Sequence, residues 1–148
     1  VGMVFQDFKL LMDRTAGENV SLTLAVAGVS ETKREESVKH VLSKVGLEGR
    51  ASAFPLQLAG GELQRVVIAR AIIGGPKLLL ADEPTGNLDP DTAWGIVELL
   101  DKIRESSGTT IIMATHNEEI VNKMHRRVIE LKQGKLARDK ESAKYKES

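Results

Sequence analysis

The sequence predicts an α/β fold in which helices flank a parallel sheet. Two short apolar segments, 78–81 and 109–115, carry most of this prediction. Apolar runs of this length are too short for membrane-spanning helices and are typical of strands buried on both faces of a parallel sheet. The first run ends at Asp82 and Glu83, and the second ends at His116. Because ligands of open α/β sheets bind at the carboxyl ends of the strands, we expect the functional site there.

Composition excludes several classes of protein. The 148 residues are enough for one domain with a core. Lys plus Arg equals Asp plus Glu at 21 each, so net charge gives no reason to expect nucleic-acid binding. The sequence has no cysteine, which excludes disulfides and thiolate metal sites and fits a reducing compartment.

Three elements are expected near the N-terminus: a strand over 1–5, a helix over 15–29 and a second helix over 30–45. Ser30 or Thr32 is expected to cap the second helix, with Glu35 completing a capping box with Thr32. Gln6 follows the strand. Its amide could accept from a metal-bound water and donate to a phosphate oxygen, although a solvated loop glutamine is the alternative. The second helix carries an apolar stripe that ends before Gly46: Val38, Val41, Leu42 and Val45.

A buried helix is expected to follow the pair Gly60-Gly61. Residues 66–73 are almost entirely apolar, which indicates burial over most of the helix circumference. Glycines at a helix start allow close approach of a neighbouring backbone, and the unpaired N–H groups of the first turn attract phosphate. The alternative is a glycine-bearing helix start with nothing bound.

Asp82 and Glu83 end the central strand at Pro84. Successive side chains of a strand point to opposite sides, so one carboxylate could hold a hard cation while the other orients a water molecule. Ordinary surface acids are the alternative.

The remaining elements expected are a helix over 92–105 starting at Asp91 or Thr92, the strand 109–115 ending at His116, and a helix over 118–124. A hairpin of 127–131 with 135–137 is expected to follow, with its turn at Gln133-Gly134.

The order and spacing of these motifs resemble the ABC-type ATPase domain, a P-loop NTPase-like fold. The resemblance runs from Val1 to about Leu136. Its motifs, in chain order, are Gln6 as the Q-loop, Leu58-Ala59-Gly60-Gly61-Glu62 as the signature, Asp82 and Glu83 as the Walker B acids, Leu88-Asp89 as the D-loop and His116 as the switch histidine.

This resemblance implies binding of ATP with Mg²⁺ and hydrolysis of ATP. Asp82 and Gln6 would hold the metal, Glu83 would polarise the attacking water, and His116 would contact the γ-phosphate. The signature residues Ala59, Gly60, Gly61 and Glu62 would close over the ATP of a second copy, so the competent unit would be a homodimer, and Asp89 would lie at the nucleotide. The domain would cover 1–138, with a helical subdomain over 15–73. We expect the polar remainder, 139–148, to be disordered.

Two departures from the family pattern stand out. No Gly-x-x-x-x-Gly-Lys-Ser/Thr occurs in the sequence, so the loop that cradles the phosphates is absent from it. We therefore expect that N-terminal strands of the domain precede Val1. Ala59 also replaces the usual signature serine, and Leu63 a usual glutamine, which predicts weaker turnover. We expect the chain alone to fold poorly, to leave strand edges open, and neither to bind nor to hydrolyse ATP appreciably.

Within the family, residues 5–15 and 18–20 look most like members that act in bacterial cell division. They imply a peripheral subunit on the cytoplasmic face of the inner membrane that drives an integral-membrane permease subunit. The stretch 81–89 is shared with relatives of lipoprotein release and macrolide export, which leaves a transporter ATPase as one alternative. A fragment acting only by interaction is another. A soluble ATPase acting on DNA or translation is disfavoured, because the sequence has no coiled-coil heptads and no second cassette.

Overall fold

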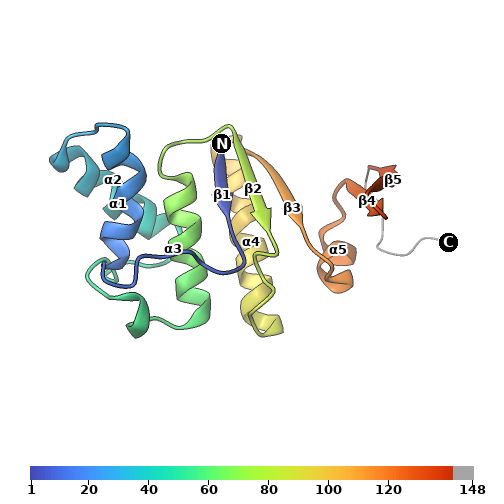
Figure 1. Cartoon of the computed structure of the whole chain (residues 1–148), viewed down its shortest axis with the longest axis horizontal. Coiled ribbons are helices and arrows are strands. Elements are labelled where there is room, and N and C mark those ends of the chain that lie inside the picture. Colours follow the sequence, from blue (N-terminus) through green and yellow to red (C-terminus); the bar gives the residue numbers. More distant parts are fainter. Residues whose placement is uncertain (142–148) are drawn as a thin grey trace. The chain divides into compact units, whose positions relative to one another are not determined.

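A computed structural model describes residues 1–141 and divides the chain into two compact units, Val1–Ala114 and Thr115–Ser148 (Figure 1). The first unit contains three strands and four α-helices, as well as a 3₁₀ turn, Pro55–Gln57: β1 (Gly2–Val4), α1 (Ala16–Val26), α2 (Glu31–Lys44), α3 (Gly60–Ile72), β2 (Leu78–Asp82), α4 (Pro90–Ser107) and β3 (Thr110–Ala114). The described part of the second unit contains α5 (Glu118–Met124), β4 (Val128–Lys132) and β5 (Lys135–Lys140). None of the helices in 1–141 has the length and apolarity to cross a membrane.

The three strands of the first unit form a parallel sheet, as predicted. Their order is β1-β2-β3, with Leu79 opposite Gly2 on one side and opposite Ile111 on the other. All three strands therefore end at the same edge of the sheet. Gln6, Asp82 and Glu83 come from that edge, where open α/β sheets place their ligands.

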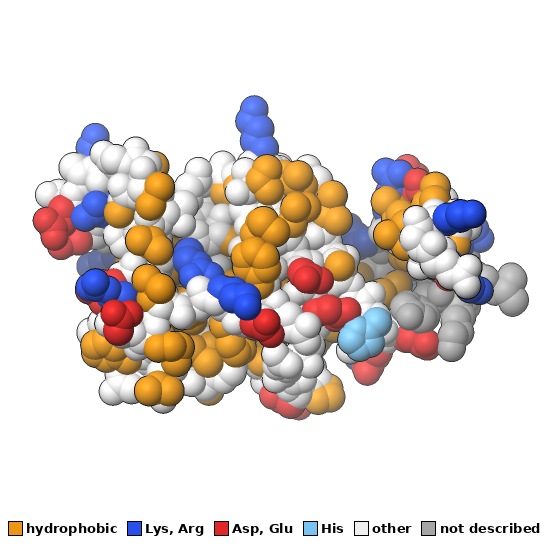
Figure 2. Space-filling model, in the orientation of Figure 1, with side chains coloured by type: hydrophobic (Ala, Val, Ile, Leu, Met, Phe, Trp, Pro, Cys, Tyr) orange, Lys and Arg blue, Asp and Glu red, His pale blue; other side chains and the backbone are white. Residues whose placement is uncertain are grey.

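The prediction that these strands are buried on both faces is wrong for residues 1–141. One face packs against α3 and α4 through the fully buried Val4, Leu79 and Ala81. On the other face Met3 is 47% and Ile112 is 56% exposed, and both pair in register with Leu80 of the central strand. Figure 2 shows hydrophobic side chains gathered over the strands on this open face. Apolar content alone predicted burial, but no other element of the first unit lies over this face.

Helices α1 and α2 pack beside α3 and form a helical group (Figure 1). The predicted stripe of α2 is confirmed, since Val38, Val41, Leu42 and Val45 are buried. The predicted capping box between Thr32 and Glu35 is wrong. Thr32 lies inside the first turn, and Ser30 is the cap residue without a side-chain hydrogen bond. The capping box forms instead at α1, where the Thr15 N–H donates to Glu18 Oε2 at 2.7 Å and the Glu18 N–H donates to Thr15 Oγ1 at 3.2 Å.

Helix α4 begins at Pro90, one residue before Asp91 and two before Thr92, the alternative predicted starts. Asp89 is its cap residue, and the Thr92 N–H donates to Asp89 Oδ2 at 3.0 Å. Pro90 follows as the first helical residue, where its fixed φ favours the helix and its missing N–H costs nothing. The prediction of Asp91 or Thr92 as the start overlooked this preference. Gly108, with φ of 63°, ends the helix in the left-handed conformation.

The second unit contains the predicted helix and hairpin. Gln133 and Gly134 form the hairpin turn with φ of 51° and 74°, as a two-residue turn of this kind requires. An ion pair between Arg127 Nη2 and Asp139 Oδ2, 2.7 Å apart, links the start of the hairpin to its last strand. Strand β5 runs to Lys140, so it includes the first two residues of the expected tail. Glu141 follows as a turn residue, and residues 142–148 of that tail lie outside the described residues.

Candidate functional site

The structure brings Gln6 against the loop that follows the two acids. Asp82 is the last residue of β2, and Gln6 comes two residues after the end of β1. A Cβ atom at Gly86 would lie 2.9 Å from Gln6 Nε2, and Asn87 Nδ2 donates to the Gln6 carbonyl oxygen at 3.4 Å. Gln6 and the loop after the acids, predicted from separate motifs, therefore adjoin at the same edge of the sheet.

The loop after Asp82 is held by backbone hydrogen bonds. The Glu83 N–H donates to the Ala114 carbonyl at 2.9 Å, which continues the pairing of β2 with β3 by one residue. Glu83 then takes a left-handed φ of 43°, and the Gly86 N–H donates to its carbonyl at 3.0 Å. Asp82 is exposed and Glu83 half-buried. Since a left-handed residue ends strand geometry, the strict alternation predicted for the two acids stops at Glu83.

Helix α3 presents its first turn beside the start of α4. The first intrahelical bond runs from the Leu63 N–H to the Ala59 carbonyl at 2.9 Å, so the N–H groups of Gly60 and Gly61 have no intrahelical acceptor. A Cβ atom at Gly61 would lie 2.5 Å from Thr92 Cγ2, and one at Gly60 would lie 3.3 Å from Leu88 Cδ2. The glycines thus permit close packing against Thr92 of α4 and Leu88 of the loop before it.

Two carboxylates predicted to meet the nucleotide are engaged within the chain. Glu62 accepts from the Ala59 N–H at 2.9 Å and from Arg50 Nε at 3.0 Å. The Ala59 hydrogen bond, with help from Arg50, lowers the pKa of Glu62. Asp89 caps α4, and its hydrogen bonds with Thr92 lower the pKa of Asp89. Both carboxylates therefore hold helix starts that border the candidate site.

His116 belongs to the second unit, two residues after β3. It directly precedes Asn117, which caps α5 by accepting from the Ile120 N–H at 3.1 Å. Its contact with a γ-phosphate stays a prediction. Within 1–141, no group of three or more His, Asp and Glu side chains is arranged to hold a metal ion. Asp82 and Gln6 nevertheless fit Mg²⁺ by donor chemistry, because this ion prefers oxygen ligands and commonly takes only one or two from protein.

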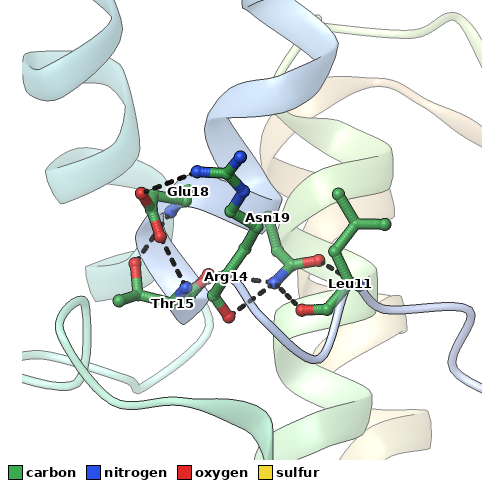
Figure 3. Close-up of polar contacts among 5 residues, drawn as sticks. All are labelled: Leu11, Arg14, Thr15, Glu18 and Asn19. Carbon is green, nitrogen blue, oxygen red and sulfur yellow. Dashed lines mark hydrogen bonds and ion pairs between the residues drawn. The ribbon is translucent and has the colours of Figure 1, made fainter.

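Sequence reasoning missed Asn19, which holds the far end of the loop after Gln6 (Figure 3). The side chain is fully buried, and Oδ1 accepts from the Leu11 N–H at 2.8 Å. Nδ2 donates to the carbonyls of Leu11, Arg14 and Thr15 at 3.0, 3.2 and 3.0 Å. The available signal was an asparagine directly before the apolar Val20 in a predicted helix.

The fold is that of an ABC-type ATPase cassette, as a family model and solved structures show. The family model described as ABC transporter matches residues 1–86. The chain belongs to this family.

Its relatives include the cell division ATP-binding protein FtsE of Streptococcus pneumoniae, which is 49% identical over 145 residues. That alignment covers 98% of this chain and 63% of the relative, so the chain spans less than two thirds of the relative's length. The methionine import ATP-binding protein MetN of Halalkalibacterium halodurans is 45% identical over 139 residues, covering 94% of this chain and 41% of that protein.

Among solved structures, the dimeric post-hydrolysis state of the ATP-binding cassette MJ0796, bound to ADP and Pi, is similar with a TM-score of 0.82 and 37% identity. The match covers 97% of this chain and 63% of that one. The predicted family and fold class are thereby confirmed.

Proposed function

We propose that this chain is part of the ATP-hydrolysing subunit of an ABC-type membrane complex that acts in bacterial cell division. The observation that carries the proposal is the 49% identity to FtsE over 98% of the chain. The position of Gln6 against the loop after Asp82 and Glu83 supports it. The partner would be an integral-membrane permease subunit of the FtsX type, with the ATPase bound peripherally at the cytoplasmic face of the membrane.

The site residues would divide the work of phosphoryl transfer. Bound Mg²⁺ would neutralise charge on the ATP phosphates, and Asp82 with Gln6 would hold it. Glu83 would orient and polarise the attacking water, and His116 would contact the γ-phosphate. Catalysis of this kind depends on positioning and charge stabilisation, so small displacements of these side chains matter.

The first turn of α3 would close over the ATP of a second copy, making a homodimer the competent unit. Its exposed Ala59 and Gly60 and the unpaired N–H groups of Gly60 and Gly61 support this role. Ala59 has no hydroxyl to donate, so this contact would depend on backbone donors. Glu62 and Asp89 would act indirectly, by fixing the starts of α3 and α4.

A chimera tests the proposal: this chain replaces the matched 145-residue segment of the Streptococcus pneumoniae FtsE. We expect the chimera to hydrolyse ATP and to restore division in cells depleted of FtsE. Glu83→Gln should lower kcat by about 10²–10³ and leave ATP binding intact, as is typical when one group that stabilises a transition state is removed. Glu105→Gln, an exposed change on α4, is the matched control.

Three outcomes would contradict parts of this proposal. If the Glu83→Gln chimera hydrolyses ATP as fast as the unchanged chimera, Glu83 does not polarise the attacking water. A folded chimera without hydrolysis would favour a fragment that acts only by interaction. A chimera that restores methionine import in cells lacking MetN, but not division, would favour a transporter ATPase. For the 148-residue chain alone we expect no micromolar ATP affinity, which isothermal titration calorimetry would measure.

A further inference from the structure

Two consecutive residues in the loop after Gln6 have a left-handed backbone. Phe8 has a φ of 52° and Lys9 a φ of 49°. Residues other than glycine, asparagine and aspartate rarely take this backbone conformation, because their Cβ atom crowds the following carbonyl. Such residues persist only where the surrounding structure restrains them. The loop therefore needs a restraint at this point.

Arg70 of α3 supplies that restraint. Its Nη1 donates to the Lys9 carbonyl at 2.6 Å, and its Nη2 donates to the Phe8 carbonyl at 3.0 Å. The guanidinium thus binds the carbonyls of the same two left-handed residues. Hydrogen bonds from a charged donor are stronger than neutral ones, and the planar fork of arginine fixes two acceptors at once.

The backbone from which Arg70 projects is itself held on two sides. The Arg70 carbonyl accepts from Thr23 Oγ1 of α1 at 3.1 Å. The next residue, Ala71, lies close to Gly2 of β1, and a Cβ atom added at Gly2 would meet the Ala71 carbonyl oxygen. The backbone at Arg70 is therefore held between α1 and β1, so its guanidinium can set the position of the loop.

The restraint lies two residues from Gln6. On its other side Gln6 contacts Gly86 and accepts from Asn87 Nδ2. If Phe8 and Lys9 relaxed to an ordinary backbone conformation, the chain direction at Asp7 would change and Gln6 would move relative to the loop after Glu83.

We propose that Arg70 is a positioning residue that sets Gln6 in the candidate site through the carbonyls of Phe8 and Lys9. This inference rests on the proposed function, which gives Gln6 its role at the metal. Arg70 touches neither nucleotide nor metal in this scheme. It connects the helix that carries Gly60 and Gly61 to the loop that carries Gln6.

The test compares Arg70→Met, Arg70→Lys and a control, Arg65→Met, in the full chain without nucleotide. Arg65 is a matched control because it lies on the same helix and its Nη1 also donates to a backbone carbonyl, that of Val45 at 2.7 Å. That bond ties α3 to the end of α2. Proton–nitrogen correlation NMR records the chemical shifts of the Gln6 side-chain amide and of the Gly86 N–H, and hydrogen exchange is followed at the Lys9 amide.

In Arg70→Met we expect the Gln6 and Gly86 signals to shift and the Lys9 amide to exchange roughly tenfold faster or more, as lost hydrogen bonds to a charged group imply. Arg70→Lys keeps the positive charge but has a single donor nitrogen in place of the planar fork, so both effects should be smaller than in Arg70→Met. Arg65→Met should leave Gln6 and Gly86 unshifted while lowering the denaturation midpoint.

Unshifted signals in Arg70→Met, or equal shifts in Arg65→Met, would overturn the proposal. If Arg70→Met does not fold, the same signals in Arg70→Lys decide. Because no nucleotide is present, the result is independent of whether the chimera hydrolyses ATP.

Discussion

At the scale of single residues, Glu62 is an anchor at the start of α3. Its carboxylate accepts from the Ala59 N–H, and its Oε1 lies 2.9 Å from Arg50 Nη2. The ionised form makes these contacts more strongly than the protonated form, and the Ala59 hydrogen bond, more than Arg50, holds the pKa of Glu62 below its ordinary value of 4.5. A group with a lowered pKa in the folded state stabilises the fold above its ordinary pKa, and this stabilisation is lost as pH falls through the lowered value.

We therefore predict that Glu62→Gln makes the chain less sensitive to acid. The wild-type chain should lose stability as pH falls below 4.5, the ordinary pKa of this group, and the variant should lose less because it has no carboxylate to protonate at this position. Urea midpoints at pH 7 and pH 3 measure the difference. Glu36→Gln, at an exposed position of α2, is the control and should behave as wild type. Equal loss of stability in both variants would contradict the prediction.

At the scale of elements, acidic side chains fix three helix starts. Glu18 at α1, Glu62 at α3 and Asp89 at α4 each accept from a backbone N–H, and in each case the pKa of the carboxyl is lowered. Such acids also complement the partial positive charge of a helix N-terminus. Two of these three starts, those of α3 and α4, meet directly through Gly61 and Thr92. The site edge is therefore built from helix ends that are fixed separately and then packed together.

Gly61→Ala tests this contact between α3 and α4. The added Cβ would meet Thr92 Cγ2 at 2.5 Å, which requires a shift of one helix start. We predict a loss of about 1–3 kcal/mol in unfolding free energy, the usual cost of overpacking. Thr92→Ser removes Cγ2 and keeps the hydroxyl, so Gly61→Ala with Thr92→Ser should regain most of this loss.

Denaturant unfolding of the two single variants and the double variant measures the coupling. Gly95→Ala on α4 is the control, since a Cβ atom there would find its nearest neighbour, Arg65 Nη2, at 3.6 Å, an ordinary contact. Strictly additive effects of the changes at Gly61 and Thr92 would show that the two residues do not limit the approach of the helices.

At the scale of the whole molecule, local sequence patterns predicted helices and strands better than they predicted tertiary contacts. The bounds of α5 and the hairpin turn at Gln133-Gly134 follow from short-range signals and were predicted closely. The bonds from Arg70 to Phe8 and Lys9 join residues about 60 positions apart, and no periodicity reveals such a pair. Candidate site residues could be found because their types and spacing resemble a family. Their contacts needed the folded chain.

The exposure of the sheet could not be predicted for a different reason. Apolar residues at Met3, Leu80 and Ile112 show that a face prefers burial, but a sequence does not show what covers it. The register places these three side chains in one row across β1, β2 and β3. In the part of the chain that the structure describes, β1 and β3 are also the edges of the sheet. An exposed apolar face that ends in open edges favours association between chains.

We predict that the chain self-associates through this face and that Ile112→Lys weakens the association. Ile112 is 56% exposed on the edge strand β3, so a lysine can reach water there, and its charge opposes pairing of two edges. Val26→Lys adds the same charge at a position that is 83% exposed at the end of α1, outside the sheet strands. Sedimentation at a series of concentrations should show a lower average mass for Ile112→Lys and an unchanged one for Val26→Lys. If both variants lower the mass equally, net charge rather than the open face governs association, and an unchanged mass for Ile112→Lys would locate the contact elsewhere.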